Sequence, residues 1–170
     1  MEFIKAKFPS CTVLLMYECG SHAYGISSSN SDKDIVVVLE GIEGVFHHKD
    51  YARNIEYFIF SKSEWIKKMN GDPNSAIYFT LFPDELLNGE YIYLGDSFNE
   101  TYQAMRNRNY SEIIDWHIQN VIRFFETYIK DGVLVKSLWH LYRVEEQVAR
   151  YVQTSVWSLE LSSTSKEKIQ

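Results

Sequence analysis

The sequence contains little cysteine. Cys11 and Cys19 are the only two among 170 residues, and they bracket an apolar run that is typical of a β-strand. The two ends of an extended strand lie too far apart for a disulfide bond, so we expect both thiols to be free. Because reduced cysteines are typical of the cytoplasm, we expect a cytoplasmic protein.

Long hydrophobic runs are also missing. No run approaches the roughly 20 apolar residues that a helix needs to cross a bilayer. The opening residues, MEFIKAKFPS, lack the apolar stretch of a signal peptide. We therefore expect no membrane span and no leader. The hydrophobic content of 45% over 170 residues still allows one domain with a real core, or a small domain with a helical appendage.

Positive charge is scarce. The chain has 17 Lys and Arg against 23 Asp and Glu, which gives a net charge of −6. Broad, sequence-independent nucleic-acid binding needs a basic surface, so this balance argues against that class of function. It leaves open a small nucleotide ligand or a local basic groove. Aromatic residues make up 15% of the chain, and we expect most of them to fill the core and surface rather than stack on bases.

The first half of the chain has the pattern of an α/β unit. Apolar, β-rich segments predict strands at 12–17, 33–39 and 55–60, with a short strand at 91–94. Between the second and third strands, residues 41–53 are polar, and we expect a connection there. The loop at 20–31 is rich in Gly, Ser and Asn, with room for a short helical turn.

Helix signals follow the third strand. Ser61 and Glu64 form a capping box that opens a helix through Met69. Asp72-Pro73 starts another helix that ends near Phe82. Beyond residue 96 the apolar residues recur at helical spacing, which predicts helices at 98–106, 111–129 and 134–151.

These elements predict an α+β fold, a small mixed β-sheet with helices followed by a C-terminal helical hairpin. We expect a core at 1–95, a helical region at 96–161 packed on it, and a flexible tail at 162–170.

Two aspartates open the second apolar segment. Asp32 and Asp34 are two residues apart on a predicted strand, so their side chains point to one face. Carboxylates about 7 Å apart along a strand repel each other unless a positive charge lies between them. Mg²⁺ fits that place, because it takes oxygen ligands and bridges to phosphates. The pair therefore predicts a magnesium site, although Asp-x-Asp alone is also common in solvated turns.

Glu56 is the third acidic candidate. It stands in the apolar run 55–60, where a carboxylate is costly unless it is paired or bound to a metal. The alternative is a water-facing position on an edge strand. If this strand lies beside 33–39, three carboxylates meet and hold two metal ions about 3.5–4 Å apart, the arrangement used for in-line phosphoryl transfer.

A Gly-Ser pair precedes the aspartates. Gly20 allows the backbone to approach a phosphate closely, and Ser21 offers its hydroxyl and N–H to phosphate oxygens. A strand, a Gly-Ser turn, a pair of carboxylates and a second strand, in that order, suit a site that holds a nucleoside triphosphate with two magnesium ions.

Residues 18–38, ECGSHAYGISSSNSDKDIVVV, resemble the signature of predicted nucleotidyltransferases in the DNA polymerase β superfamily. The likeness is closest to a bacterial and phage subfamily, some members of which are associated with RNA repair. Its pattern is Glu-x-Gly-Ser-Arg-Ala-Trp-Gly followed by Ser-Asp-x-Asp. The positions that match are Glu18, Gly20, Ser21, Ala23, Gly25, Ser31, Asp32 and Asp34. His22 replaces the arginine and Tyr24 the tryptophan.

The resemblance implies a role for several residues. Asp32, Asp34 and Glu56 are the implied catalytic metal ligands. The implied nucleotide-binding residues are Glu18, Gly20, Ser21, His22, Lys136, His140 and Arg143. The last three, at helical spacing, resemble a basic stripe in the family that faces the nucleotide, and a solvated helix face is the alternative. The likeness weakens after residue 39, and a glutamate that the family carries after the Asn-Pro of its next helix has no counterpart near Ile77-Tyr78-Phe79.

The predicted reaction is Mg²⁺-dependent transfer of a nucleoside monophosphate from an NTP to an acceptor hydroxyl or phosphate, with release of pyrophosphate. The acceptor is an RNA 3′ end, a small molecule or a protein side chain. The alternatives are a catalytically silent module that binds nucleotide or a partner, and a member of a toxin–antitoxin pair that nucleotidylates a protein.

Two further candidates have simpler interpretations. His47-His48 has no second cluster of metal ligands near it in sequence, so we assign it to a polar loop. Cys19 lacks a Cys–His–acid pattern, so we expect a core cysteine at a strand end rather than a nucleophile.

Overall fold

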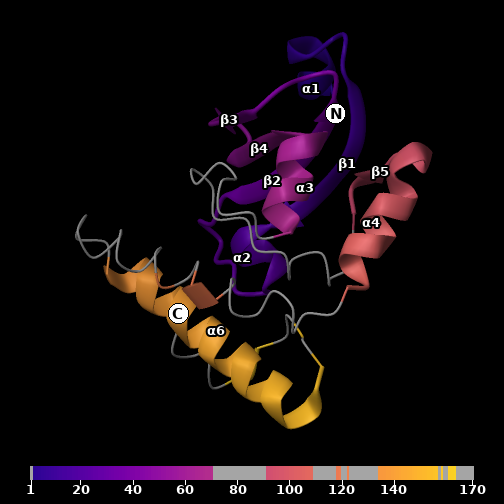
Figure 1. Ribbon diagram of the computed structural model, residues 1–170. Coiled ribbons are helices and arrows are strands. Elements are labelled where there is room, and N and C mark those ends of the chain that lie inside the picture. Colours follow the sequence, from indigo (N-terminus) through magenta and orange to yellow (C-terminus); the bar gives the residue numbers. More distant parts are fainter. Residues whose placement is uncertain are drawn as a thin grey trace.

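The computed structural model describes residues 2–70, 91–108, 118–119, 122, 134–156, 158 and 161–163, with the backbone alone over 134–141. It contains a five-stranded mixed sheet with several helices, an α+β arrangement (Figure 1). The strands are β1 (Thr12–Cys19), β2 (Lys33–Glu40), β3 (Val45–Asp50), β4 (Ile55–Ser61) and β5 (Tyr93–Leu94). They lie in the order β3-β4-β2-β1-β5, and only the β2–β4 pair is parallel.

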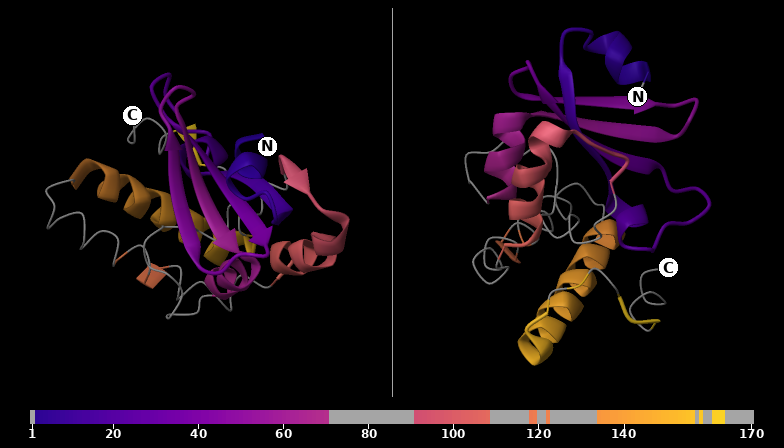
Figure 2. Two further views of the ribbon diagram at one scale, coloured as in Figure 1. Left: turned by 90° about the horizontal axis from the view of Figure 1, so that it is seen from above. Right: turned by 90° about the vertical axis from the view of Figure 1, so that its right-hand side faces the viewer.

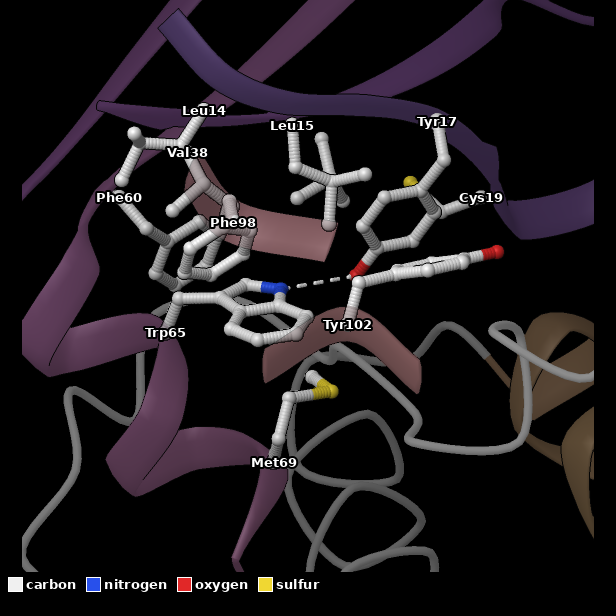
Figure 3. Packing of buried hydrophobic residues seen from close by; sticks show 11 residues of the cluster. Leu14, Leu15, Tyr17, Cys19, Val38, Phe60, Trp65, Met69, Phe98 and Tyr102 are labelled. Atoms are coloured by element: carbon white, nitrogen blue, oxygen red, sulfur yellow. Dashed lines mark hydrogen bonds between the residues drawn. The ribbon is translucent and has the colours of Figure 1, made fainter. Parts of the chain in front are cut away.

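Side chains alternate between the two faces of this sheet and build two cores. One face packs against α3 (Lys62–Met69), the 3₁₀ turn η2 (Asp96–Phe98) and α4 (Asn99–Arg106). Trp65 at its centre is fully buried, lies against Phe98 and donates its indole N–H to the Tyr17 hydroxyl at 3.2 Å (Figure 3). Figure 2 shows α3 and α4 side by side on this face in its right-hand view.

The opposite face is covered by the short helix α1 (Glu2–Lys7). Ile4 is buried among Val37, Leu39 and Ile59, and the ring of Phe3 stacks on His48 with centroids 4.2 Å apart. Because both faces of the central strand β2 are covered, its apolar residues run continuously from Ile35 to Leu39.

The C-terminal helix α6 (Leu134–Thr154) lies below the sheet, next to the short helix α2 (Gly20–Ala23), as Figure 1 shows. The guanidinium of the fully buried Arg143 sits 4.1 Å from the centroid of the Tyr24 ring, a cation–π contact, and donates to Gln147 Oε1 at 3.0 Å. Ser162 donates from its N–H and hydroxyl to the Glu146 carboxylate, which holds the start of the tail against α6.

Most of the predicted elements within the described ranges are confirmed. The predicted strands correspond to β1, β2, β4 and β5, and the capping box is real, since Ser61 Oγ accepts from the Glu64 N–H at 3.3 Å. The predicted helices at 98–106 and 134–151 correspond to α4 and α6. Neither cysteine forms a disulfide bond, and Cys19 is buried at the end of β1. Two predicted helices lie largely or wholly outside the described residues. They are the helix from Asp72 to Phe82 and the helix at 111–129, of which three residues are described.

The predictions made for the polar segment 41–53 were wrong. Residues 41–53, expected to be a connection, contain the edge strand β3, so His47 and His48 lie on a strand rather than in a loop. The helix α1 was not predicted from the opening residues.

None of the helices in the described ranges combines the length and the apolar character that crossing a bilayer requires.

Candidate functional site

Three carboxylates converge where β2 and β4 begin. Asp34 and Glu56 are direct partners in the parallel register, so their side chains lie on the same face of the sheet. Asp32 precedes β2 by one residue and shares that face. One oxygen from each of Asp32, Asp34 and Glu56 lies within 4.8 Å of the others, and all three residues are half-buried. The adjacency of the second and third predicted strands, on which the cluster depended, is therefore confirmed.

Asp32 is held in place by the turn between β3 and β4. Asn54, with a left-handed backbone at φ 54°, accepts the Lys33 N–H on its carbonyl at 2.9 Å and donates its side-chain amide to the Ser31 carbonyl at 3.3 Å. These two hydrogen bonds fix the backbone of the residues on either side of Asp32. Its carboxylate is thus positioned by a segment that lies more than twenty residues further along the chain.

Gly20 follows β1 directly and faces Asp34. Cys19 and Asp34 are partners in the β1–β2 register, and the chain turns at Gly20 with φ +66°. A Cβ atom on Gly20 would overlap Asp34 Oδ2. The glycine is therefore required both by its backbone conformation and by the close approach of the Asp34 carboxylate.

Gly20→Ala is expected to destabilise the protein more than Gly25→Ala does. Both glycines have nearly the same positive φ, +66° and +65°, and the left-handed conformation costs a non-glycine residue about 1–2 kcal/mol. A Cβ at Gly25 meets nothing within 4 Å, whereas one at Gly20 must displace Asp34, which adds about 1–3 kcal/mol. Urea unfolding of the two variants measures the difference. Equal losses would mean that the contact with Asp34 imposes no constraint.

The edge strand β3 adds basic groups to the acidic cluster. Lys49 is the cross-strand partner of Glu56, and its Nζ lies 2.8 Å from Asp32 Oδ2. The hydrogen bond to Asp32, followed by the charge of Glu56, raises the pKa of Lys49 above its ordinary value, so the ammonium is charged at neutral pH. His47 Nε2 donates to Glu56 Oε1 at 2.6 Å, while its ring stacks on Phe58.

Sequence reasoning missed both basic residues, because it treated their segment as a connection. The segment shows no apolar–polar alternation that would have marked it as a strand, and only its pairing with β4 places Val45, His47 and Lys49 on one face.

The other predicted site residues lie at different places. Glu18 forms an ion pair with Lys33, and the register places it opposite Ile35, on the face of the sheet away from Asp34. Ser21 and His22 lie in α2, directly after Gly20. Arg143 is buried under Tyr24, so a solvated helix face does not describe it. The side chains of Lys136 and His140 lie outside the described residues, although both positions belong to α6.

The donor set of the cluster fits a hard divalent cation. Three carboxylates offer oxygen ligands, which Mg²⁺, Mn²⁺ and Ca²⁺ prefer, whereas zinc and copper favour nitrogen and sulfur. Because Gly20 has no side chain, its backbone comes close to the Asp34 carboxylate. The residues present therefore suit a divalent cation such as the magnesium that the resemblance implies.

Neither a scan against protein-family models nor a search of curated proteins finds a match for this chain.

Proposed function

We propose that this protein transfers a nucleoside monophosphate from a magnesium-bound NTP to an acceptor and releases pyrophosphate. The observation that carries the proposal is the convergence of Asp32, Asp34 and Glu56 within 4.8 Å, directly beside the tight turn at Gly20. A triphosphate needs cations next to a surface that its backbone can approach. Both requirements meet at this end of the sheet.

The roles of the residues follow from their positions. Asp32 and Asp34 hold the divalent cations, which when bound neutralise the triphosphate and lower the pKa of the acceptor hydroxyl. Gly20 and Ser21 lie where the chain leaves β1 and contact the phosphates through backbone N–H groups and the serine hydroxyl. Glu56 lies beside Asp34 in the neighbouring strand, helps to hold the catalytic cation and takes the proton of the acceptor hydroxyl.

The reaction balances as a single displacement. The acceptor oxygen forms a bond to the α-phosphorus, and the bond between that phosphorus and the oxygen bridging to the β-phosphate breaks. The electron pair leaves with pyrophosphate, and the acceptor proton goes to Glu56. The geometry required is in-line, with the acceptor and the pyrophosphate on opposite sides of the phosphorus.

One observation favours a second candidate, a silent nucleotide-binding module. Asp32 and Glu56 already have partners from their own chain, Lys49 at 2.8 Å and His47 at 2.6 Å. These ion pairs balance the charge of the carboxylates without a metal. This is expected of a protein that keeps the fold but has no catalytic activity.

The position of the label in ATP separates these candidates. The purified protein is incubated with Mg²⁺, a cell lysate and ATP labelled at either the α- or the γ-phosphate, and the other three NTPs are tested in parallel. We expect label from the α position to enter RNA, protein or a small molecule, and EDTA to prevent this. Label from the γ position is expected to leave as pyrophosphate. Transfer of the γ label would indicate a kinase, and binding of ATP without any transfer would identify the silent module.

A further inference from the structure

Lys49, on the edge strand β3, lies beside the acidic cluster. It is the direct cross-strand partner of Glu56, and its ammonium is hydrogen-bonded to Asp32 at 2.8 Å. It therefore lies next to two of the three carboxylates whose oxygens fall within 4.8 Å of one another. Ionised carboxylates at that separation repel, and an ammonium among them offsets part of the repulsion.

We propose that Lys49 serves as a built-in counter-ion, so that without nucleotide this site takes one divalent cation rather than two. The inference rests on the proposed function, since it concerns the same metal site. It adds to the expectation drawn from the resemblance, which implies a pair of ions in the nucleotide-bound site. Lys49 is therefore a positioning residue, which determines how many divalent cations the site binds when no nucleotide is present.

Charge balance supports a single ion. Three carboxylates and one ammonium leave two net negative charges, which one divalent cation neutralises. A second divalent cation would leave the half-buried cluster with two net positive charges, at distances where like charges repel strongly. The triphosphate brings the negative charge that the second ion requires, so that ion arrives with the nucleotide.

Competition for Asp32 leads to the same result. One Asp32 oxygen is already bonded to Lys49, and Asn54 fixes the backbone on both sides of Asp32. A cation that uses this oxygen must displace the ammonium. Binding of free metal is therefore weakened by Lys49, whereas binding of the metal–nucleotide complex gives the ammonium a phosphate to pair with.

The experiment counts bound Mn²⁺ by electron paramagnetic resonance and by titration calorimetry in the absence of nucleotide. The wild-type chain is expected to bind one ion. Lys49→Met is expected to bind that ion about tenfold tighter or to bind a second one, because it removes a positive charge 2.8 Å from an oxygen of Asp32.

Two further variants complete the test. Lys49→Gln keeps a hydrogen-bond donor without the charge and decides the matter if the methionine variant does not fold. Lys33→Met is the matched control, because it removes an ammonium that lies next to Asp32 in sequence but pairs with Glu18 on the opposite face. Its Mn²⁺ binding is expected to change much less than that of the Lys49 variants.

The inference is overturned if wild type binds two ions without nucleotide, or if folded Lys49 variants bind Mn²⁺ with the same number and affinity as wild type. Its failure is distinct from failure of the proposed function, which is judged by transfer of the α label. A chain that transfers the α label but shows no effect of Lys49 on Mn²⁺ keeps its function and loses this inference. A chain that shows the Lys49 effect without transfer is a metal site with another use.

Discussion

Asp34→Asn is expected to abolish Mg²⁺-dependent nucleotidyl transfer, with turnover lowered by roughly 10³-fold or more, the scale seen when one member of a catalytic unit is removed. Asp34 lies at the centre of the site, because it is the register partner of both Glu56 and Cys19 and faces Gly20. Asparagine has the same shape, so the close approach of Gly20 is kept. The negative charge that attracts the metal is lost. Turnover is measured as pyrophosphate released per chain.

The matched control for this prediction is Glu40→Gln. Glu40 ends the same strand, is exposed and pairs with Lys62 at 3.4 Å, at the opposite end of β2 from the cluster. It also loses a carboxylate, and a surface ion pair of this kind contributes little to stability. We expect it to keep wild-type turnover, and both variants to keep the wild-type circular dichroism. A folded Asp34→Asn variant with normal turnover would remove the basis of the proposed function.

Local sequence patterns were sufficient for the strands that carry the acidic residues. The β-branched and aromatic residues in the apolar runs at 12–17, 33–39 and 55–60 predict strands. In the structure these runs are strands whose apolar residues are largely buried in the sheet. The parity of Asp32 and Asp34 placed both carboxylates on one face before any pairing was known. The acidic cluster was therefore accessible from the sequence once two strands were assumed to be neighbours.

The strand β3 was not accessible in this way, for a physical reason. Val45–Asp50 reads VFHHKD, and its polar residues hide the alternation that a half-buried strand normally shows. Among the strands that the structure describes, it is an edge strand paired with β4, and part of its stabilisation comes from distant residues, such as Phe3 stacked on His48 and Phe8 against Phe46. Its contributions to the site, Lys49 and His47, thus depend on long-range contacts that no local pattern encodes.

The position of Arg143 shows the same limit. Helical spacing placed it on one stripe of a helix, but spacing does not state what that stripe faces. The structure buries the guanidinium against the ring of Tyr24, which closes the short helix α2 as its C-terminal cap. Arg143 therefore reaches the Gly-Ser turn through Tyr24, and α6 supports the segment that we assign to the phosphates.

The site also depends on the core beside it on the same face of the sheet, which is covered by α3 and α4. Trp65 connects three elements there: it belongs to α3, packs edge-on against Phe98 with ring centroids 5.5 Å apart, and donates to the Tyr17 hydroxyl on β1 (Figure 3). Tyr17 is two residues before Cys19, where β1 turns into Gly20. The packing of Trp65 therefore holds the strand from which the phosphate turn begins.

Trp65→Ala is expected to cost about 3–5 kcal/mol of unfolding free energy, because it removes a fully buried indole and leaves a cavity that the surrounding sheet cannot fill. For a chain of this length the loss corresponds to a fall in Tm of roughly 6–20 °C.

Trp65→Phe keeps a ring against Phe98 but loses the hydrogen bond to Tyr17, so we expect a smaller loss of about 1–2 kcal/mol. Tyr51→Ala removes an aromatic ring that is 85% exposed and is expected to change stability by about 0.5 kcal/mol or less. Urea and thermal unfolding followed by circular dichroism rank the three variants. If Trp65→Ala were no more destabilising than Tyr51→Ala, α3 and α4 would not be packed against this face of the sheet, and the positions of Tyr17 and of the turn after Cys19 would need another explanation.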